Sequence, residues 1–360
     1  MPSARAAPPP RNDSWSAPNG AGCGIRRARY TRAAVSDLRV YDRLSDAVGW
    51  TPLVRLGRTM EGLPAEAFAK IEFMNPMGSV KDRIARHMIR KALEEGSLHA
   101  GDVVVESSSG NTAMGMAMMA VLEGLRCRMV VRRQTSREKL DCLRAMGVDL
   151  VLVDGELPPD HPESYNQKAK HVARETPRSY FPDQHNNRAN SEAHYLTTGP
   201  EIWRQMQGCI DFLVAGMGTG GTICGVARYL KEQDPRIRVI AVDPVGSVFF
   251  DHFKGRRGVP GKSLLEGLGD EEVIGCPQFE LIDDMYRVTD RDAFLSAREL
   301  ARKEAILAGG SSGAALWGVR RLLLDLDRPA RIVTLFPDSG SRYLSTIFND
   351  DWMRERGFLE

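Results

Sequence analysis

The sequence predicts an α/β fold made of two three-layer domains with mostly parallel sheets. The first observation is that short β-branched segments alternate with amphipathic segments from about residue 40 to the end of the chain. Strands that alternate with helices pair in parallel, and the helices then cover both faces of the sheet. The second observation is that glycine- or serine-rich turns follow some of the apolar segments. Ligands of open α/β sheets bind at such turns, where strand ends meet helix N-termini.

In the first half of the chain, the alternation begins with residues 67–73, whose period of two is typical of a half-buried strand. Residues 79–95 then repeat apolar side chains at helical spacing, and Ser79 with Asp82 three residues later is typical of a weak capping box. The other elements expected in this half are strands at 103–105, 127–131 and 150–153 and helices at 111–123 and 136–146.

The second half repeats the pattern, and its apolar runs are bounded by Gly, Pro and Asp in the same way. Strands are expected at 212–215, 238–242 and 332–336, and helices at 222–232, 290–305 and 312–324. A chain of 360 residues is long enough for roughly two domains with sizeable cores.

Composition excludes several classes of function. The chain has 49 basic and 47 acidic residues, so the basic excess of a nucleic-acid-binding protein is missing and a small-molecule partner is expected. No apolar run approaches the roughly 20 residues that a membrane span needs. The six cysteines form no metal-ligand spacing, so no metal site is expected, and their scatter favours a reducing compartment such as the cytoplasm.

Residues 1–39 differ from the rest because they are rich in Ala, Pro, Ser, Gly and Arg and poor in acidic residues. This composition predicts a disordered N-terminal tail. An organelle transit peptide is the alternative, since such peptides are also rich in arginine and poor in acid.

The turn Gly218-Thr219-Gly220-Gly221-Thr222 is the best candidate for a phosphate cradle. Its glycines let the backbone approach an anion closely, and its two hydroxyls can add hydrogen bonds. The pattern is neither GxGxxG nor a P-loop. Taken alone, it is equally compatible with a tight strand–helix turn that binds nothing.

A second unusual segment, Asn75 to Arg83, places Lys81 in the first turn of a predicted helix. The positive end of the helix dipole disfavours a further positive charge there. Such a lysine loses its proton more readily, which Schiff-base chemistry requires. A single lysine in this position is more often an exposed residue without a function.

Four segments occur together in one order: residues 75–83, 107–112, 218–222 and 309–313. With them the chain resembles the pyridoxal 5'-phosphate (PLP) dependent β-family, fold-type II, of tryptophan synthase β-like architecture. Within it, the resemblance is to the cysteine synthase and cystathionine β-synthase group, and it covers residues 48–359. It implies PLP as cofactor and a homodimer. It also implies a smaller domain, 75–187, and a larger one that joins 48–74 to 188–360.

The resemblance assigns a role to individual residues. It implies that Lys81 forms the Schiff base with the cofactor, that Asn111 contacts its 3'-hydroxyl and that Ser311 faces its pyridine nitrogen. The phosphate would be bound by Gly218, Thr219, Gly220, Gly221 and Thr222. The substrate carboxylate would be held by Ser108, Ser109, Thr112 and Gln184, with Gly267 in a loop beside the site. His185 and His194 lie near these segments and are expected to have structural roles.

The implied activity is β-replacement on serine, O-acetylserine or O-phosphoserine through an α-aminoacrylate, with Lys81 as the base at Cα. The nucleophile is expected to be a thiol, either homocysteine or sulfide. An amine nucleophile, as in synthases of a 2,3-diaminopropionate precursor, is an alternative. So is serine dehydratase-type β-elimination, and a scaffold without catalysis is the alternative outside enzymes.

Overall fold

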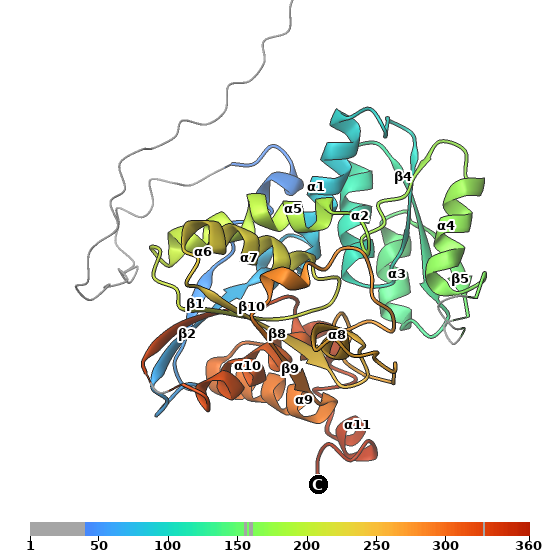
Figure 1. The fold of residues 1–360 in the computed structure, drawn as a ribbon. Helices are drawn as coiled ribbons and strands as arrows, with labels where there is room; N and C mark the ends of the chain where they lie inside the picture. Colours follow the sequence, from blue (N-terminus) through green and yellow to red (C-terminus); the bar gives the residue numbers. More distant parts are fainter. Residues whose placement is uncertain (1–39, 155–156, 158–160, 327) are drawn as a thin grey trace, which may run out of the picture. The chain divides into compact units, whose positions relative to one another are not determined.

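Within the described residues, the strands of the computed structural model form two sheets (Figure 1). The description covers residues 40–154, 157, 161–326 and 328–360, so the predicted tail lies outside it. The six-stranded sheet has the order β1 (Leu53–Leu56), β2 (Ala65–Ile71), β10 (Ala330–Phe336), β7 (Phe212–Gly216), β8 (Arg238–Pro244) and β9 (Asp284–Val288). The four-stranded sheet has the order β5 (Asp149–Val153), β4 (Arg126–Arg132), β3 (Val103–Ser107) and β6 (Ser179–Tyr180).

All strand pairs are parallel except β1 with β2. The described residues also form eleven α-helices. They are α1 (Lys81–Glu94), α2 (Asn111–Leu122), α3 (Arg137–Ala145), α4 (Tyr165–Glu175), α5 (Ala189–Leu196), α6 (Thr198–Gln205), α7 (Gly221–Gln233), α8 (Phe249–Phe253), α9 (Asp290–Glu299), α10 (Gly310–Leu323) and α11 (Asp350–Glu355). The mostly parallel α/β class is therefore confirmed, whereas the domain boundaries at residues 75 and 187 stay a prediction.

Helices cover both faces of the four-stranded sheet, and the side chains of β3 show this directly. Val104 belongs to a core cluster with residues of α1 and α2, whereas Val103 and Val105 belong to a second cluster with residues of α4. Successive residues of a strand point to opposite faces. The run of valines at 103–105 is thus apolar on both sides because both sides are buried.

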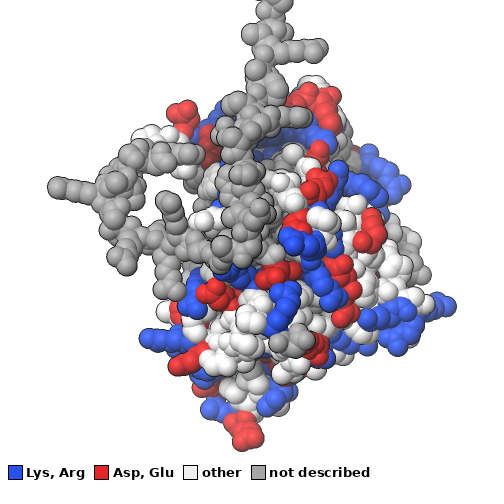
Figure 2. Space-filling model, turned by 60° about the vertical axis from the view of Figure 1, so that its left-hand side comes forward, with Lys and Arg blue, Asp and Glu red and all other residues white. Residues whose placement is uncertain are grey.

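The six-stranded sheet also lies between helices, with α9 and α10 on one side and α5, α6 and α7 on the other in Figure 1. Its largest core cluster joins apolar residues of the strands to α9 and α10 and includes Phe294, Leu316 and Phe336. On the face shown in Figure 2, acidic and basic side chains are interspersed. Surface ion pairs such as Arg90–Asp46 join charges of opposite sign.

Two expected helix boundaries were wrong. The helix expected from residue 79 begins at Lys81, because Ser79 pairs with Asp338 in a β-bridge and the N–H of Val80 donates to the carbonyl of Pro337 at 2.8 Å. The Asp82 carboxylate accepts from the N–H of Met77 at 2.6 Å. The first turn is therefore shaped by a tertiary contact and not by a capping box.

The helix expected over 290–305 is α-helical only to Glu299. Leu300–Glu304 continues as a π-helix and ends at Ala305, which has a left-handed φ of 56°. The Glu304 carboxylate accepts hydrogen bonds from both the N–H and the hydroxyl of Thr59, each at 2.7 Å. This contact with a residue about 245 positions earlier has no signature in the helical periodicity.

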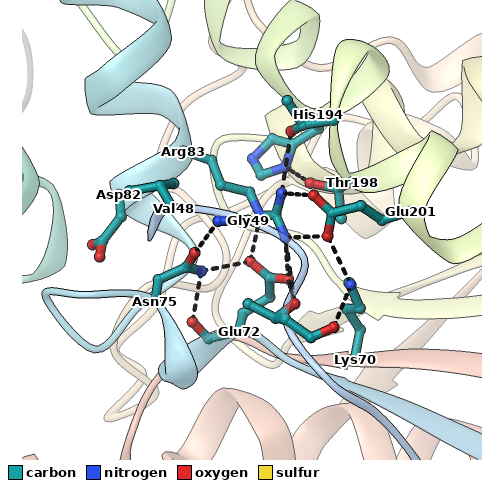
Figure 3. A network of polar contacts seen from close by, with 12 residues as sticks. Val48, Gly49, Lys70, Glu72, Asn75, Asp82, Arg83, His194, Thr198 and Glu201 are labelled. Atoms are coloured by element: carbon teal, nitrogen blue, oxygen red, sulfur yellow. Dashed lines mark hydrogen bonds and ion pairs between the residues drawn. The ribbon is translucent and has the colours of Figure 1, made fainter. Parts of the chain in front are cut away.

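A buried cluster of charges connects α1 to the six-stranded sheet (Figure 3). Arg83 on α1 donates to both oxygens of Glu72, at 2.6 and 2.9 Å, and to both oxygens of Glu201 on α6, at 2.7 and 2.8 Å. Lys70 at the end of β2 contacts Glu201 at 2.7 Å. The side chains of Lys70, Glu72 and Arg83 are fully buried. Two positive and two negative charges thus neutralise one another in the interior.

We expect Arg83→Met to lower the free energy of unfolding by about 3–5 kcal/mol, because it removes the positive charge that pairs with the two buried carboxylates of Glu72 and Glu201. Urea titration of the purified protein would measure the change. The control is Arg137→Met, whose ion pair with Asp141 is exposed and is expected to contribute at most about 1 kcal/mol. Equal losses in the two variants would contradict the prediction.

Candidate active site

Lys81 is the first residue of α1, and its backbone N–H donates to the hydroxyl of Ser79 at 3.2 Å. Burial lowers the pKa of the Lys81 ammonium, and the nearby carboxylate of Asp338 opposes that shift. A lysine with a lowered pKa is more readily neutral, and only the neutral amine can act as a nucleophile or a base. The structure therefore gives Lys81 the environment that its predicted role requires.

Asp338 is a site residue that the sequence analysis missed. It follows β10, and its Oδ2 accepts from Asn111 Nδ2 at 2.9 Å and from the hydroxyl of Tyr343 at 2.7 Å. Its backbone carbonyl accepts from the N–H of Gly309 at 3.1 Å. Asp338 thus brings together Lys81, Asn111 and the turn that precedes Ser311. An acidic residue two positions after a buried parallel strand was the available signal.

Unsatisfied atoms at this point indicate that the site is built for a polar group. Among the described residues, Asn111 Oδ1, Asp338 Oδ1 and Ser312 Oγ are buried and have no hydrogen-bond partner. Buried polar atoms are rarely left unpaired unless a ligand or water completes them. Gly309 adds to this arrangement, because a Cβ there would lie 2.2 Å from Asp338 Oδ1. Ser311, which is 7% exposed, lies in the first turn of α10 beside these atoms.

The predicted phosphate cradle joins β7 to α7. Gly220 has φ +78°, and a Cβ on it would lie 2.8 Å from Pro277 Cα. A Cβ on Gly218 would lie 2.1 Å from the carbonyl oxygen of Gly267, which places the predicted loop residue Gly267 against the cradle. The backbone N–H groups of residues 218–222 donate no hydrogen bond to other described residues. These N–H groups at a helix N-terminus suit an anion such as a phosphate.

The predicted carboxylate-binding residues lie between β3 and α2, with Gln184 nearby. Thr112 donates its hydroxyl to Gln184 Oε1 at 2.6 Å, so two residues far apart in the sequence do meet. Ser108 Oγ accepts from the N–H groups of Gly110 and Ala113, at 3.4 and 3.2 Å, and so caps α2. Ser109 lies close to Tyr165, the first residue of α4.

Glu106 organises this part of the site and was also missed. It is 1% exposed and accepts from the N–H of Ser107 at 2.8 Å and from the N–H of Gln184 at 3.1 Å. It therefore holds the Gln184 segment against the end of β3. Burial raises the pKa of the Glu106 carboxyl to about 7, although these N–H groups lower it in part.

Among the described residues, no group of three or more His, Cys, Asp or Glu side chains is arranged to hold a metal ion. None of the helices in the described part of the chain has the length and the apolarity to cross a lipid bilayer.

We compare the free energy of unfolding of the original protein with that of the variant Glu106→Gln. As the pH rises from 5 to 8, we expect the value of the original protein to fall relative to that of the variant. The pKa of Glu106 is higher in the folded state than its ordinary value, so the protonated form stabilises the fold and this contribution is lost as the pH rises through about 7. The relative loss should reach at most about 3 kcal/mol. Urea titrations of both proteins at several pH values would measure it, and a pH-independent difference would contradict it.

Several known proteins are similar to this chain over most of its length. The chain is 40% identical over 340 residues to cystathionine beta-synthase of Apis mellifera, which covers 94% of this chain and 66% of that protein. It is 40% identical over 309 residues to N-(2-amino-2-carboxyethyl)-L-glutamate synthase of Ralstonia nicotianae, covering 86% and 90%. It is 38% identical over 307 residues to cysteine synthase of Staphylococcus aureus, covering 85% and 96%. The cystathionine beta-synthases of rat and mouse extend further, and the chain spans 56% of their length.

Among solved structures, an O-acetylserine dependent cystathionine beta-synthase from Helicobacter pylori is similar, with a TM-score of 0.77 and 34% identity. The match covers 86% of this chain and 99% of that one. A family described as "Pyridoxal-phosphate dependent enzyme" matches residues 44–338. The chain belongs to this family, within the group of cysteine synthase and cystathionine beta-synthase, and pyridoxal 5'-phosphate is its cofactor.

Proposed function

We propose that this chain replaces the β-substituent of serine, O-acetylserine or O-phosphoserine by a thiol. The observation that carries the proposal is the hydrogen bond from Asn111 to Asp338, whose charge acts on Lys81. Among the described residues, Asn111 Oδ1 and Asp338 Oδ1 are buried and unpaired. Relatives named cystathionine beta-synthase and cysteine synthase support the same reaction class.

When bound, PLP supplies an electron sink that acidifies the Cα–H of the amino acid. Lys81 would first hold the cofactor and then, once displaced, take the proton from Cα. Its lowered pKa suits this task, because the amine must be neutral to accept a proton. Asn111 would keep one amide hydrogen on Asp338 and would have a second for the 3'-oxygen of the cofactor.

Ser311 supports β-replacement over reactions that need a long-lived carbanion. A hydroxyl facing the pyridine nitrogen cannot hold that nitrogen protonated, as a carboxylate would, so the electron sink is weaker. Departure of the β-group is then favoured over accumulation of negative charge at Cα. The substrate would be oriented through its carboxylate by Thr112, Gln184 and the hydroxyls of residues 108 and 109.

A polar cavity of about 190 Å³ lies beside the predicted carboxylate-binding loop. Ser107, Asn166, Lys170, Asp183, His185 and Glu272 are among the residues that line it. A nucleophile that is itself an amino acid carries an ammonium and a carboxylate, and this lining offers a partner for each. Sulfide carries neither group. The cavity therefore supports homocysteine over sulfide, and it also suits an amino-acid amine such as glutamate as the second candidate.

We expect Lys81→Ala to reduce β-replacement by at least about a hundredfold and to remove the visible absorbance of the covalently held cofactor. Activity would be assayed with each of the three donors and with homocysteine, sulfide and glutamate as nucleophiles. Lys168→Ala is the control, because Lys168 pairs with Glu163 on the surface at 2.7 Å. Full activity in Lys81→Ala would refute the role of Lys81. Faster release of pyruvate from serine than formation of any replacement product would refute β-replacement.

For the cavity, we expect Lys170→Ala to raise the KM for homocysteine or glutamate about tenfold and to leave that for sulfide unchanged. The reason is that only the amino-acid nucleophiles present a carboxylate to this lysine. Steady-state kinetics at saturating donor would measure both constants, again with Lys168→Ala as the matched lysine on the same helix. An equal change for sulfide would exclude the cavity as the nucleophile site.

A further inference from the structure

One face of helix α5 contacts both threonines of the Gly218–Thr222 turn. Asn190 and His194 lie four residues apart on this helix and therefore point the same way. Asn190 Nδ2 lies 2.9 Å from Thr219 Oγ1, and His194 Nε2 lies 3.1 Å from Thr222 Oγ1. The close approach of α5 to α7 depends on Gly225, where a Cβ would lie 2.2 Å from the carbonyl oxygen of Ser191.

The direction of the Asn190 hydrogen bond follows from its other partner. The same Nδ2 lies 2.8 Å from the carbonyl oxygen of Gln184, which can only accept. The nitrogen is therefore correctly placed, and its second hydrogen points to Thr219. Because Thr219 Oγ1 accepts this bond, its own hydroxyl hydrogen stays available for another acceptor.

The direction of the His194 hydrogen bond follows from burial. His194 and Thr198 are both 0% exposed, and His194 Nδ1 lies 2.8 Å from Thr198 Oγ1. The Thr198 hydroxyl has no other partner in the described chain. It therefore donates to Nδ1, because a buried hydroxyl hydrogen without an acceptor is unfavourable. Thr222 is half-buried and faces no such constraint. In a neutral ring, an accepting Nδ1 leaves the proton on Nε2, which then donates to Thr222.

Burial keeps His194 neutral beside the charge cluster of Figure 3. Burial and then the positive charges of Arg83 and Lys81 lower the pKa of His194 well below its ordinary value. Arg83 also donates to the hydroxyl of Thr197, the residue before Thr198, at 3.2 Å. The ring is therefore held in one protonation state next to the turn.

We propose that Asn190 and His194 are positioning residues that turn the hydroxyls of Thr219 and Thr222 outward as hydrogen-bond donors to the phosphate of the cofactor. A phosphate can only accept hydrogen bonds. A hydroxyl that donated its hydrogen to His194 would direct its lone pairs at the phosphate and repel the phosphate. The inference rests on the proposed placement of the phosphate at Gly218–Thr222.

Two substitutions of His194 distinguish the contributions of its two ring nitrogens. In His194→Gln the amide reaches the position of Nε2 and can still donate to Thr222, whereas in His194→Asn it reaches only that of Nδ1. Titration of the full-length apoenzyme with PLP should give a Kd about tenfold higher for His194→Asn and within about twofold of the original for His194→Gln. Titration with pyridoxal, which lacks the phosphate, should give the same Kd for all three proteins.

Thr222→Val separates failure of this inference from failure of the phosphate placement. It should raise the Kd for PLP by itself, and adding His194→Asn to it should then change nothing further. An unchanged Kd in Thr222→Val would refute the phosphate placement. A raised Kd in Thr222→Val without any effect of His194→Asn would refute the role of His194 alone. Equal weakening of PLP and pyridoxal by His194→Asn would show that His194 supports only the fold.

Discussion

The structure depends on the neutralisation of four buried charges around Arg83. An isolated charge in the interior is strongly unfavourable, so each member of the cluster must stay within contact of its partners. Since its members come from β2, the 3-10 turn directly after β2, α1 and α6, the cluster fixes the start of α1 relative to the six-stranded sheet. Lys81 is two residues before Arg83, and its position is determined by the same constraint.

The site lies where strand ends of the two sheets meet. Asn111 follows the end of β3 in the four-stranded sheet, Asp338 follows the end of β10 in the six-stranded sheet, and a hydrogen bond of 2.9 Å joins them. The pairing of Ser79 with Asp338 adds the segment that carries Lys81. Parallel strands direct their carboxyl ends to one edge, and this topology lets residues of separate motifs act together.

Periodicity alone predicted elements such as the strand Val103–Ser107 and helix α1, and both are present. Their apolar side chains line both faces of the strand and one face of the helix. Helices α4, α5 and α6 were not expected, although α4 and α6 are amphipathic. Glu106 and Asp338 were missed for a physical reason. In the sequence, a buried carboxylate cannot be told from a surface charge, because the N–H groups and hydroxyls that stabilise it come from the folded structure.

By itself, the sequence determined the fold class and the cofactor and predicted the segments of the candidate site, because backbone preferences and the order of the four motifs can be read from the chain without its fold. Only the tertiary structure decided which atoms meet. The pairing of Thr112 with Gln184, that of Asn111 with Asp338 and the contact of His194 with Thr222 each join residues that are not neighbours in the chain. Such contacts depend on burial and on competing partners, and those are defined only once the chain is folded.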